Sequence, residues 1–282
     1  MNGAEEKSLT RLVFLGTGTS QGVPIIGCHC GVCRSANPRD HRLRSSVALE
    51  SKGTRVVVDT GPDFRTQMLR EQFESLDAVV YTHEHKDHLA GMDDVRPFNY
   101  IQKSAMTLHA SADVETALHR DFHYAFAENK HGGVPDVLVK KVADYESFVA
   151  GGMTWEPLPV MHGKLPIHGY RIDDLAYITD ANAIPDETLA RMEGLSVLIL
   201  NALRPTPHYS HFSLPEALEV ANRVGAQKTY LTHLSHLMGC HDDVSVSLPS
   251  GVHLAFDGLA LERGDSGWEE RCSPWFEQIA MS

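Results

Sequence analysis

The segment Thr82-His83-Glu84-His85-Lys86-Asp87-His88 constrains this chain more than any other part of its sequence. It follows a short apolar run, Leu76 to Tyr81, which predicts a strand that ends where the cluster begins. Three imidazoles and a carboxylate supply ligands suited to Zn²⁺, Mn²⁺ or Fe²⁺. All four would crowd one ion, whereas neighbouring side chains diverge in a turning segment, so the spacing predicts two ions. The alternative is a polar surface loop that is rich in histidine by chance.

A second cluster, Cys28-His29-Cys30-Gly31-Val32-Cys33, places three thiols at C-x-C-x-x-C spacing. This spacing is typical of structural zinc sites, and one ligand is still missing. Three incidental thiols are the alternative. The chain has 5 cysteines, an odd number concentrated in one segment, which does not fit a secreted disulfide framework. We therefore expect a cytoplasmic protein.

Composition and charge limit the partners. The chain has 282 residues, of which 42% are hydrophobic, and contains no apolar run of about 18 residues that would predict a membrane span. Its polar start, residues 1–7, predicts that there is no signal peptide. A net charge of −12 disfavours nucleic acid polymers. A small anionic substrate is still compatible, because bound metal ions invert the local charge.

Strands and helices alternate along the chain without a linker or low-complexity segment. A first strand, 11–15, runs into the glycine-rich stretch 16–24, for which a tight turn is favoured over a phosphate-binding loop. Hydrophobic patterning predicts further strands at 45–51, 55–59, 107–110, 153–161, 169–172, 175–179, 197–200 and 228–231, and helices at 62–73, 111–122 and 213–224. Ser213 and Glu216 form a predicted capping box for the last helix.

Polar residues of metal-binding type close several of these strands. His162, Asp180 and His233 each follow an apolar run, which repeats the arrangement of the first cluster. Asp59 also ends a strand, and two interpretations stay open for it. Its carboxylate either orients a metal-bound histidine from behind or lies exposed in a turn.

The T-H-x-H-x-D-H segment, a later lone histidine, a strand-ending aspartate and a final T-H resemble the metallo-β-lactamase-fold hydrolases from about residue 12 to 258. The G-T-G-T-S-Q-G-V-P start, the C-x-C-x-x-C element and the T-H-L-S-H ending are most similar to PhnP-type phosphodiesterases, with tRNA 3′-processing nucleases more distant. The resemblance implies an α/β fold, a four-layer αββα sandwich. We expect a single domain over 1–282, with its core at about 11–262 and a C-terminal extension at 263–282. Three aromatic residues of that extension, Trp268, Trp275 and Phe276, are expected to cover an apolar surface or a subunit contact.

The same resemblance implies a ligand set. One Zn²⁺ or Mn²⁺ ion would be held by His83, His85 and His162, a second by Asp87, His88 and His233, and Asp180 would bridge the two. A separate structural zinc would be held by Cys28, Cys30, Cys33 and His236. Cys240 and His241 follow closely and are possible competing ligands.

The function expected from these residues is hydrolysis of a small, linear or cyclic, phosphodiester by hydroxide held between two metal ions. Asp87, Asp180 and His211 are the expected catalytic residues, with His211 preferred to His208 as the general acid. The alternatives are tRNA 3′ processing, which needs a basic docking arm that the sequence lacks, thioester or lactam hydrolysis, and a non-catalytic metal or redox protein. A small substrate, no membrane and no nucleic acid polymer are expected as partners, and a homodimer is one option for assembly.

Overall fold

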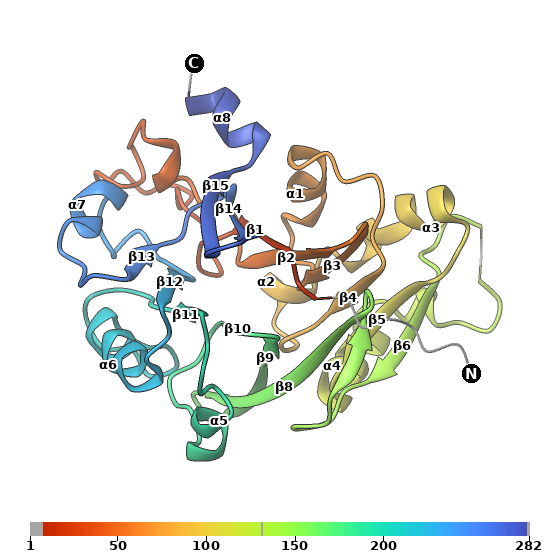
Figure 1. Ribbon diagram of the computed structural model, residues 1–282. Helices are drawn as coiled ribbons and strands as arrows, with labels where there is room; N and C mark the ends of the chain where they lie inside the picture. The colour runs from red at the N-terminus through yellow and green to blue at the C-terminus, as the bar shows by residue number, and fades with distance from the viewer. Residues whose placement is uncertain (1–7, 131, 281–282) are drawn as a thin grey trace.

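The computed structural model describes residues 8–130 and 132–280 as two β-sheets packed face to face, with helices on both outer faces (Figure 1). The expected four-layer αββα sandwich is thereby confirmed. The polar start on which we based the absence of a signal peptide, residues 1–7, lies outside the described residues. None of the described helices combines the length and apolar character needed to cross a bilayer.

The first sheet has eight strands in the order β15-β14-β1-β2-β3-β4-β5-β6. Strands β3 to β6 are parallel to one another, and the remaining pairs, including β2 with β3, are antiparallel. The strands are β1 (Arg11–Gly16), β2 (Ser46–Ser51), β3 (Thr54–Val58), β4 (Ala78–Val80), β5 (Met106–Ala110), β6 (Val137–Lys141), β14 (Leu259–Gly264) and β15 (Gly267–Cys272).

The second sheet has seven strands in the order β13-β12-β11-β10-β9-β8-β7. Strands β10 to β13 are parallel, whereas β7 to β10 are antiparallel. The strands are β7 (Phe148–Ala150), β8 (Met153–His162), β9 (Leu165–Ile172), β10 (Leu175–Ile178), β11 (Val197–Asn201), β12 (Lys228–Thr232) and β13 (Val252–Leu254).

Helices cover the outer face of each sheet. Apolar side chains of α1, α3 and α4 pack with the outer face of the first sheet, and those of α6 with the outer face of the second. The helices are α1 (Phe64–Arg70), α2 (Lys86–Leu89), α3 (Arg96–Gln102), α4 (Ala112–Asp121), α5 (Asp186–Ala190), α6 (Leu214–Val224), α7 (His241–Ser245) and α8 (Pro274–Ala280), with short 3₁₀ helices η1 (Pro38–Asp40), η2 (Met92–Val95) and η3 (His123–Ala125).

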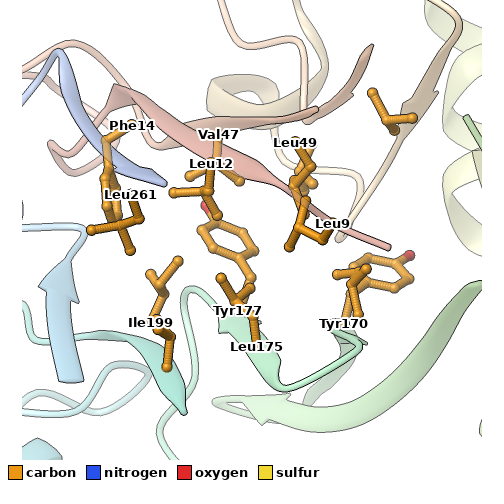
Figure 2. Packing of buried hydrophobic residues seen from close by; sticks show 14 of the residues in the cluster. Leu9, Leu12, Phe14, Val47, Leu49, Tyr170, Leu175, Tyr177, Ile199 and Leu261 are labelled. Atoms are coloured by element: carbon orange, nitrogen blue, oxygen red, sulfur yellow. The ribbon is translucent and has the colours of Figure 1, made fainter. Parts of the chain in front are cut away.

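The central core lies between the two sheets. Strand residues alternate between faces, so Leu12 and Phe14 of β1 point toward Tyr177 of β10 and Ile199 of β11 (Figure 2). All four side chains are inaccessible to solvent. Burial of this apolar surface holds the two sheets together in a fixed arrangement. The candidate metal-binding side chains lie at one edge of the two sheets.

The C-terminal residues complete the first sheet. β15 pairs with β14, and α8 folds back on the core. Trp268 and Phe276 are only 5% and 3% exposed, and the half-buried Trp275 packs against the same cluster. Of the two roles that the sequence suggested for these aromatic residues, the structure shows that they cover an apolar surface of the protein's own core.

Candidate metal centre

Four strand ends place the predicted ligands together. The segment from His83 to His88 follows β4, His162 ends β8, and Asp180 and His233 follow β10 and β12. The backbone turns sharply at three positions, because Asp59, Asp180 and His233 have φ angles of 65°, 61° and 56°. Residues other than glycine rarely adopt this left-handed conformation, and where they do so, the site often depends on it.

The side chains form overlapping groups whose ligand atoms lie within 4.8 Å of one another. Asp180 belongs to three of the four groups, which is the position expected of a bridging carboxylate. The groups are His83, His85 and His162; His83, His88 and Asp180; Asp87, Asp180 and His233; and His162, Asp180 and His211. The first reproduces the set that the resemblance assigns to one ion. All seven predicted ligands of the dinuclear site are therefore brought together.

Hydrogen bonds from behind fix the ring orientations. Nδ1 of His88 donates to Oδ2 of Asp59 at 2.7 Å. Nδ1 of His162 donates to the Ser210 carbonyl at 2.8 Å. When the rings are neutral, these bonds keep the proton on Nδ1, so that Nε2 presents the lone pair that a metal ligand requires. Of the two interpretations of Asp59, the structure supports the one in which it orients a histidine.

His83 is oriented by a hydroxyl group, and His233 has a hydroxyl group and a carboxylate beside its Nδ1. Thr82 Oγ1 donates to Asp59 and therefore accepts from Nδ1 of His83, at 2.9 Å. Nδ1 of His233 lies 3.2 Å from Oδ2 of Asp180 and 3.3 Å from Oγ of Ser45, which donates to the Gly18 carbonyl. These partners were missed in the sequence, because a threonine or serine that orients a histidine has no distinctive spacing.

The residues present fit a bound metal. The Nε2 atoms of His88 and His233 are buried and make no hydrogen bond, although carboxylate oxygens of Asp87 and Asp180 lie 3.2 and 3.3 Å from that of His88. An unpaired buried polar atom is costly, and native proteins rarely leave one without a reason. Both atoms belong to residues that share a ligand group with Asp180, and cation binding would satisfy them.

The electrostatic field of the site is strongly polarised. Burial disfavours charge on His88, yet three surrounding carboxylates, Asp180, Asp87 and Asp59, raise its pKa well above the usual value. Burial likewise raises the pKa of Asp180, but the imidazoles of His233 and His88 outweigh it and hold that pKa well below its usual range. Asp180 is therefore anionic at neutral pH, as cation binding requires, and His88 must release a proton when a cation enters.

His211 lies beside this centre, whereas His208 is one ring further away. Nδ1 of His211 is 3.8 Å from Oδ1 of Asp180 and has no hydrogen-bond partner. Its ring centroid is 4.7 Å from that of His162 and 5.1 Å from that of His208. Burial, followed by the nearby His233, lowers the pKa of His211 to about 3. Of the two histidines, His211 is therefore the one that lies beside Asp180, and its ring is neutral in the free protein.

The cysteine cluster forms a second, separate centre. The sulfur atoms of Cys28, Cys30 and Cys33 lie 3.3, 3.4 and 3.6 Å from Nδ1 of His236. Ligand atoms around a tetrahedral zinc, with Zn–S of about 2.3 Å and Zn–N of about 2.0 Å, are about 3.5 Å apart. The four predicted ligands thus already have the spacing of a closed zinc site.

The thiols of this centre differ in acidity. A hydrogen bond from the Cys33 N–H, followed by the contact with His236, lowers the pKa of Cys30 to about 6. Burial raises the pKa of Cys33 to about 11, so its proton must leave when a metal enters. Cys240 and His241 do not join this group. His241 instead contacts the buried guanidinium of Arg42 at 3.3 Å.

Comparisons with known proteins agree with this geometry. The family profile described as the β-lactamase superfamily domain matches residues 54–234. The crystal structure of a diphosphatase from the PhnP family has 41% sequence identity and a TM-score of 0.85, covering 94% of this chain and 99% of that chain. Zn²⁺-bound PqqB from Methylobacterium extorquens has a TM-score of 0.72 over 89% of this chain and 99% of that one. At 20% identity, PqqB shows a shared fold alone.

A curated relative gives a different name. The octanoyltransferase of Porphyromonas gingivalis is 38% identical over 251 residues, which cover 88% of this chain and 51% of that protein. The present chain therefore spans about half the length of this relative. The name octanoyltransferase refers to a protein that has a large part outside the matched region.

Proposed function

We propose that this chain, a PhnP-like member of the β-lactamase superfamily, catalyses the metal-dependent hydrolysis of a small phosphodiester. The observation that carries the proposal is the position of Asp180, which shares ligand groups with His83, His162 and His233. A carboxylate in this position can serve two cations at once. Paired divalent ions are a recurring arrangement for in-line displacement at phosphorus.

The chain's own residues divide into two ion sites. We assign His83, His85 and His162 to one divalent ion and Asp87, His88 and His233 to the other, with Asp180 shared. When bound, such ions stabilise negative charge on phosphoryl oxygens and activate water at neutral pH. Zn²⁺ and Mn²⁺ both suit these ligands. PqqB, which has this fold, binds Zn²⁺, and this supports a metal ion in the present chain.

His211 is assigned the role of general acid. Its Nδ1 lies 3.8 Å from Oδ1 of Asp180 and has no hydrogen-bond partner, so the ring lies directly beside the proposed metal centre. Departure of an alkoxide needs a proton, which an imidazolium can supply. Because the ring is neutral in the free protein, the anionic phosphate must raise its pKa when the substrate binds.

Cys28, Cys30, Cys33 and His236 are assigned to a structural zinc. All four ligand positions of a tetrahedral ion are filled by protein atoms, so no position is left for a substrate. His236 is joined through Ser235 and Leu234 to His233 of the catalytic group. The zinc would therefore secure the loop that delivers a catalytic ligand.

The diphosphatase relative supports a phosphate-containing substrate. The net charge of −12 favours a small substrate over a nucleic acid polymer. Cysteines without a disulfide partner favour the cytoplasm as the compartment. A homodimer is retained as a proposal for the assembly.

The experiment is a substrate panel with metal-loaded protein: bis(4-nitrophenyl) phosphate, 2′,3′-cyclic nucleotides, a thioester and nitrocefin. We expect turnover of the two phosphodiester classes, abolished by a chelator and restored by Zn²⁺ or Mn²⁺. Turnover of the thioester or of nitrocefin, with none of either phosphodiester, would overturn the proposal.

A further inference from the structure

The loop that carries His211 is fastened at several points. It connects β11 to α6 and contains Arg204, whose guanidinium donates to the carbonyls of Thr206 at 3.2 Å and Pro207 at 2.8 Å. Pro205 and Pro207 restrict the backbone further. This part of the loop is therefore held in one conformation by its own residues.

The same loop is attached to the turn between β8 and β9. The Asn182 side chain donates to the Tyr209 carbonyl at 3.3 Å and accepts from the Gly163 N–H at 2.6 Å. His162 donates to the next carbonyl, that of Ser210. Two consecutive carbonyls are thus tied to the turn that supplies a ligand, and the backbone of Tyr209 has a fixed position relative to the metal centre.

The side chain of Tyr209 contrasts with this fixed backbone, because it is 83% exposed. Among the phenylalanine, tyrosine and tryptophan side chains that the structure describes, only Tyr100, at 63%, is also classed as exposed. Tyr100 lies on α3, an outer helix (Figure 1). Tyr209 instead lies beside the β8–β9 turn, since a Cβ added to Gly163 would be 4.0 Å from its Cδ2.

A row of rings leads from Tyr209 into the centre. The ring centroids of Tyr209 and His208 are 4.6 Å apart, those of His208 and His211 are 5.1 Å apart, and those of His211 and His233 are 4.8 Å apart. One end of the row is a proposed metal ligand and the other is an exposed aromatic face. A molecule that reaches both ends must carry a phosphate and, at some distance from it, a group that stacks on an aromatic ring.

We propose that Tyr209 is a stacking subsite for the nucleobase of a nucleotide substrate, a proposal that rests on the proposed phosphodiester hydrolysis for the position of the phosphate. In a nucleotide, the ribose lies between the flat aromatic base and the phosphate. In the row of rings, His208 likewise lies between Tyr209 and His211. Because Tyr209 and the proposed general acid share one loop, the base belongs to the departing alcohol. The preset position of Tyr209 lowers the entropy cost of this contact.

Two probes that differ by the base alone test the subsite without requiring turnover. Calorimetry would measure the binding of AMP and of ribose 5-phosphate to the Zn²⁺-loaded protein. Stacking on an aromatic side chain predicts that AMP binds about 5- to 150-fold more tightly. Tyr209→Ala should remove this difference and leave the affinity for ribose 5-phosphate unchanged. Tyr209→Phe should retain it, and the matched control Tyr100→Ala should change neither affinity.

Three results would overturn the subsite: equal affinities of the two probes for the wild-type protein, a difference that survives in Tyr209→Ala, or an equal loss of both probes in that variant. A different result would refute the proposed hydrolysis. A base-dependent affinity together with no turnover of any phosphodiester would retain the subsite and refute the reaction, whereas turnover with base-independent affinity would do the reverse.

Discussion

The carboxylate of Asp59 lies 2.7 Å from Nδ1 of His88, and both side chains are completely buried. The same carboxylate accepts from the backbone N–H and the hydroxyl of Thr82, each at 2.8 Å. Asp59, which follows β3, therefore fixes the positions of Thr82 and His88, the two ends of the histidine segment that follows β4. Its hydrogen bond to Nδ1 leaves Nε2 of His88 facing Asp87 and Asp180, where a metal can replace the proton.

Asp59→Asn should weaken divalent metal binding by about 10- to 100-fold, because the amide keeps the size of the side chain but supports His88 less well. Competition with a chromogenic chelator measures this affinity directly. The matched control is Asp77→Asn, since the Asp77 carboxylate accepts only from the backbone N–H of Arg55, at the surface, among the contacts described. Equal affinities in the wild type and Asp59→Asn would show that Asp59 does not orient a ligand.

The ligand segments could be predicted from the sequence because their chemistry is local. One turn contains His83, His85, Asp87 and His88. The apolar runs that precede the ligands predict strands in the order in which the structure has them. Strand lengths were less accurate. Of the predicted strand 76–81, only Ala78–Val80 is regular strand, although the N–H groups of Asp77 and Tyr81 still donate to neighbouring carbonyls. β9 begins at Leu165, four residues before the predicted start.

The supporting shell could not be predicted, because it depends on contacts between distant segments. Ser210 orients His162 through a backbone carbonyl, which any residue type could supply. Asn182 joins two loops that only the folded sheets bring together. The acidity of His211 likewise follows from burial among neighbours that are far away in the sequence.

Cys30→Ser should destabilise the protein without emptying the catalytic centre. A closed four-ligand zinc site contributes directly to folding, so we expect the free energy of unfolding to fall by about 3 kcal/mol or more. Thermal unfolding and elemental analysis would show a lower Tm and the loss of one zinc only. The control Cys272→Ser lies outside both metal groups and should retain every ion. Loss of activity at an unchanged Tm would instead make the cysteine centre catalytic.

His211→Ala should slow the hydrolysis of esters with alkyl leaving groups by about 10²- to 10⁴-fold, the usual contribution of a general acid. Esters of 4-nitrophenol should be spared, since this leaving group departs without a proton. His208→Ala, one ring further from Asp180, should have little effect on either rate. Steady-state kinetics on both ester types distinguishes the roles, because equal losses in His211→Ala would indicate structural damage.

His109 should make stability depend on pH. It is 3% exposed and stacks on Phe148, with the ring centroids 4.6 Å apart. Burial, followed by the charge of Lys140, lowers the pKa of His109 from 6.5 to about 4. Between these values the unfolded chain binds a proton that the folded protein does not, so stability falls as the pH falls. The full loss is roughly 3 kcal/mol.

Urea unfolding at pH 7 and pH 5 tests this dependence. His109→Phe removes the titrating group, so its loss of stability between the two pH values should be smaller than that of the wild type by up to about 2 kcal/mol. His119→Gln, at an exposed position of α4, should leave the wild-type difference unchanged. An identical pH dependence in His109→Phe and the wild type would contradict the assignment.

The central claim is that Asp180 shared between two ions enables phosphodiester hydrolysis. The most direct measurement is the turnover of bis(4-nitrophenyl) phosphate by wild-type protein and by Asp180→Ala, each with its metal content determined. We predict three metal ions per wild-type chain, and in the variant loss of turnover with retention of the zinc at Cys28, Cys30, Cys33 and His236. A variant that keeps a near-normal rate would contradict the dinuclear account.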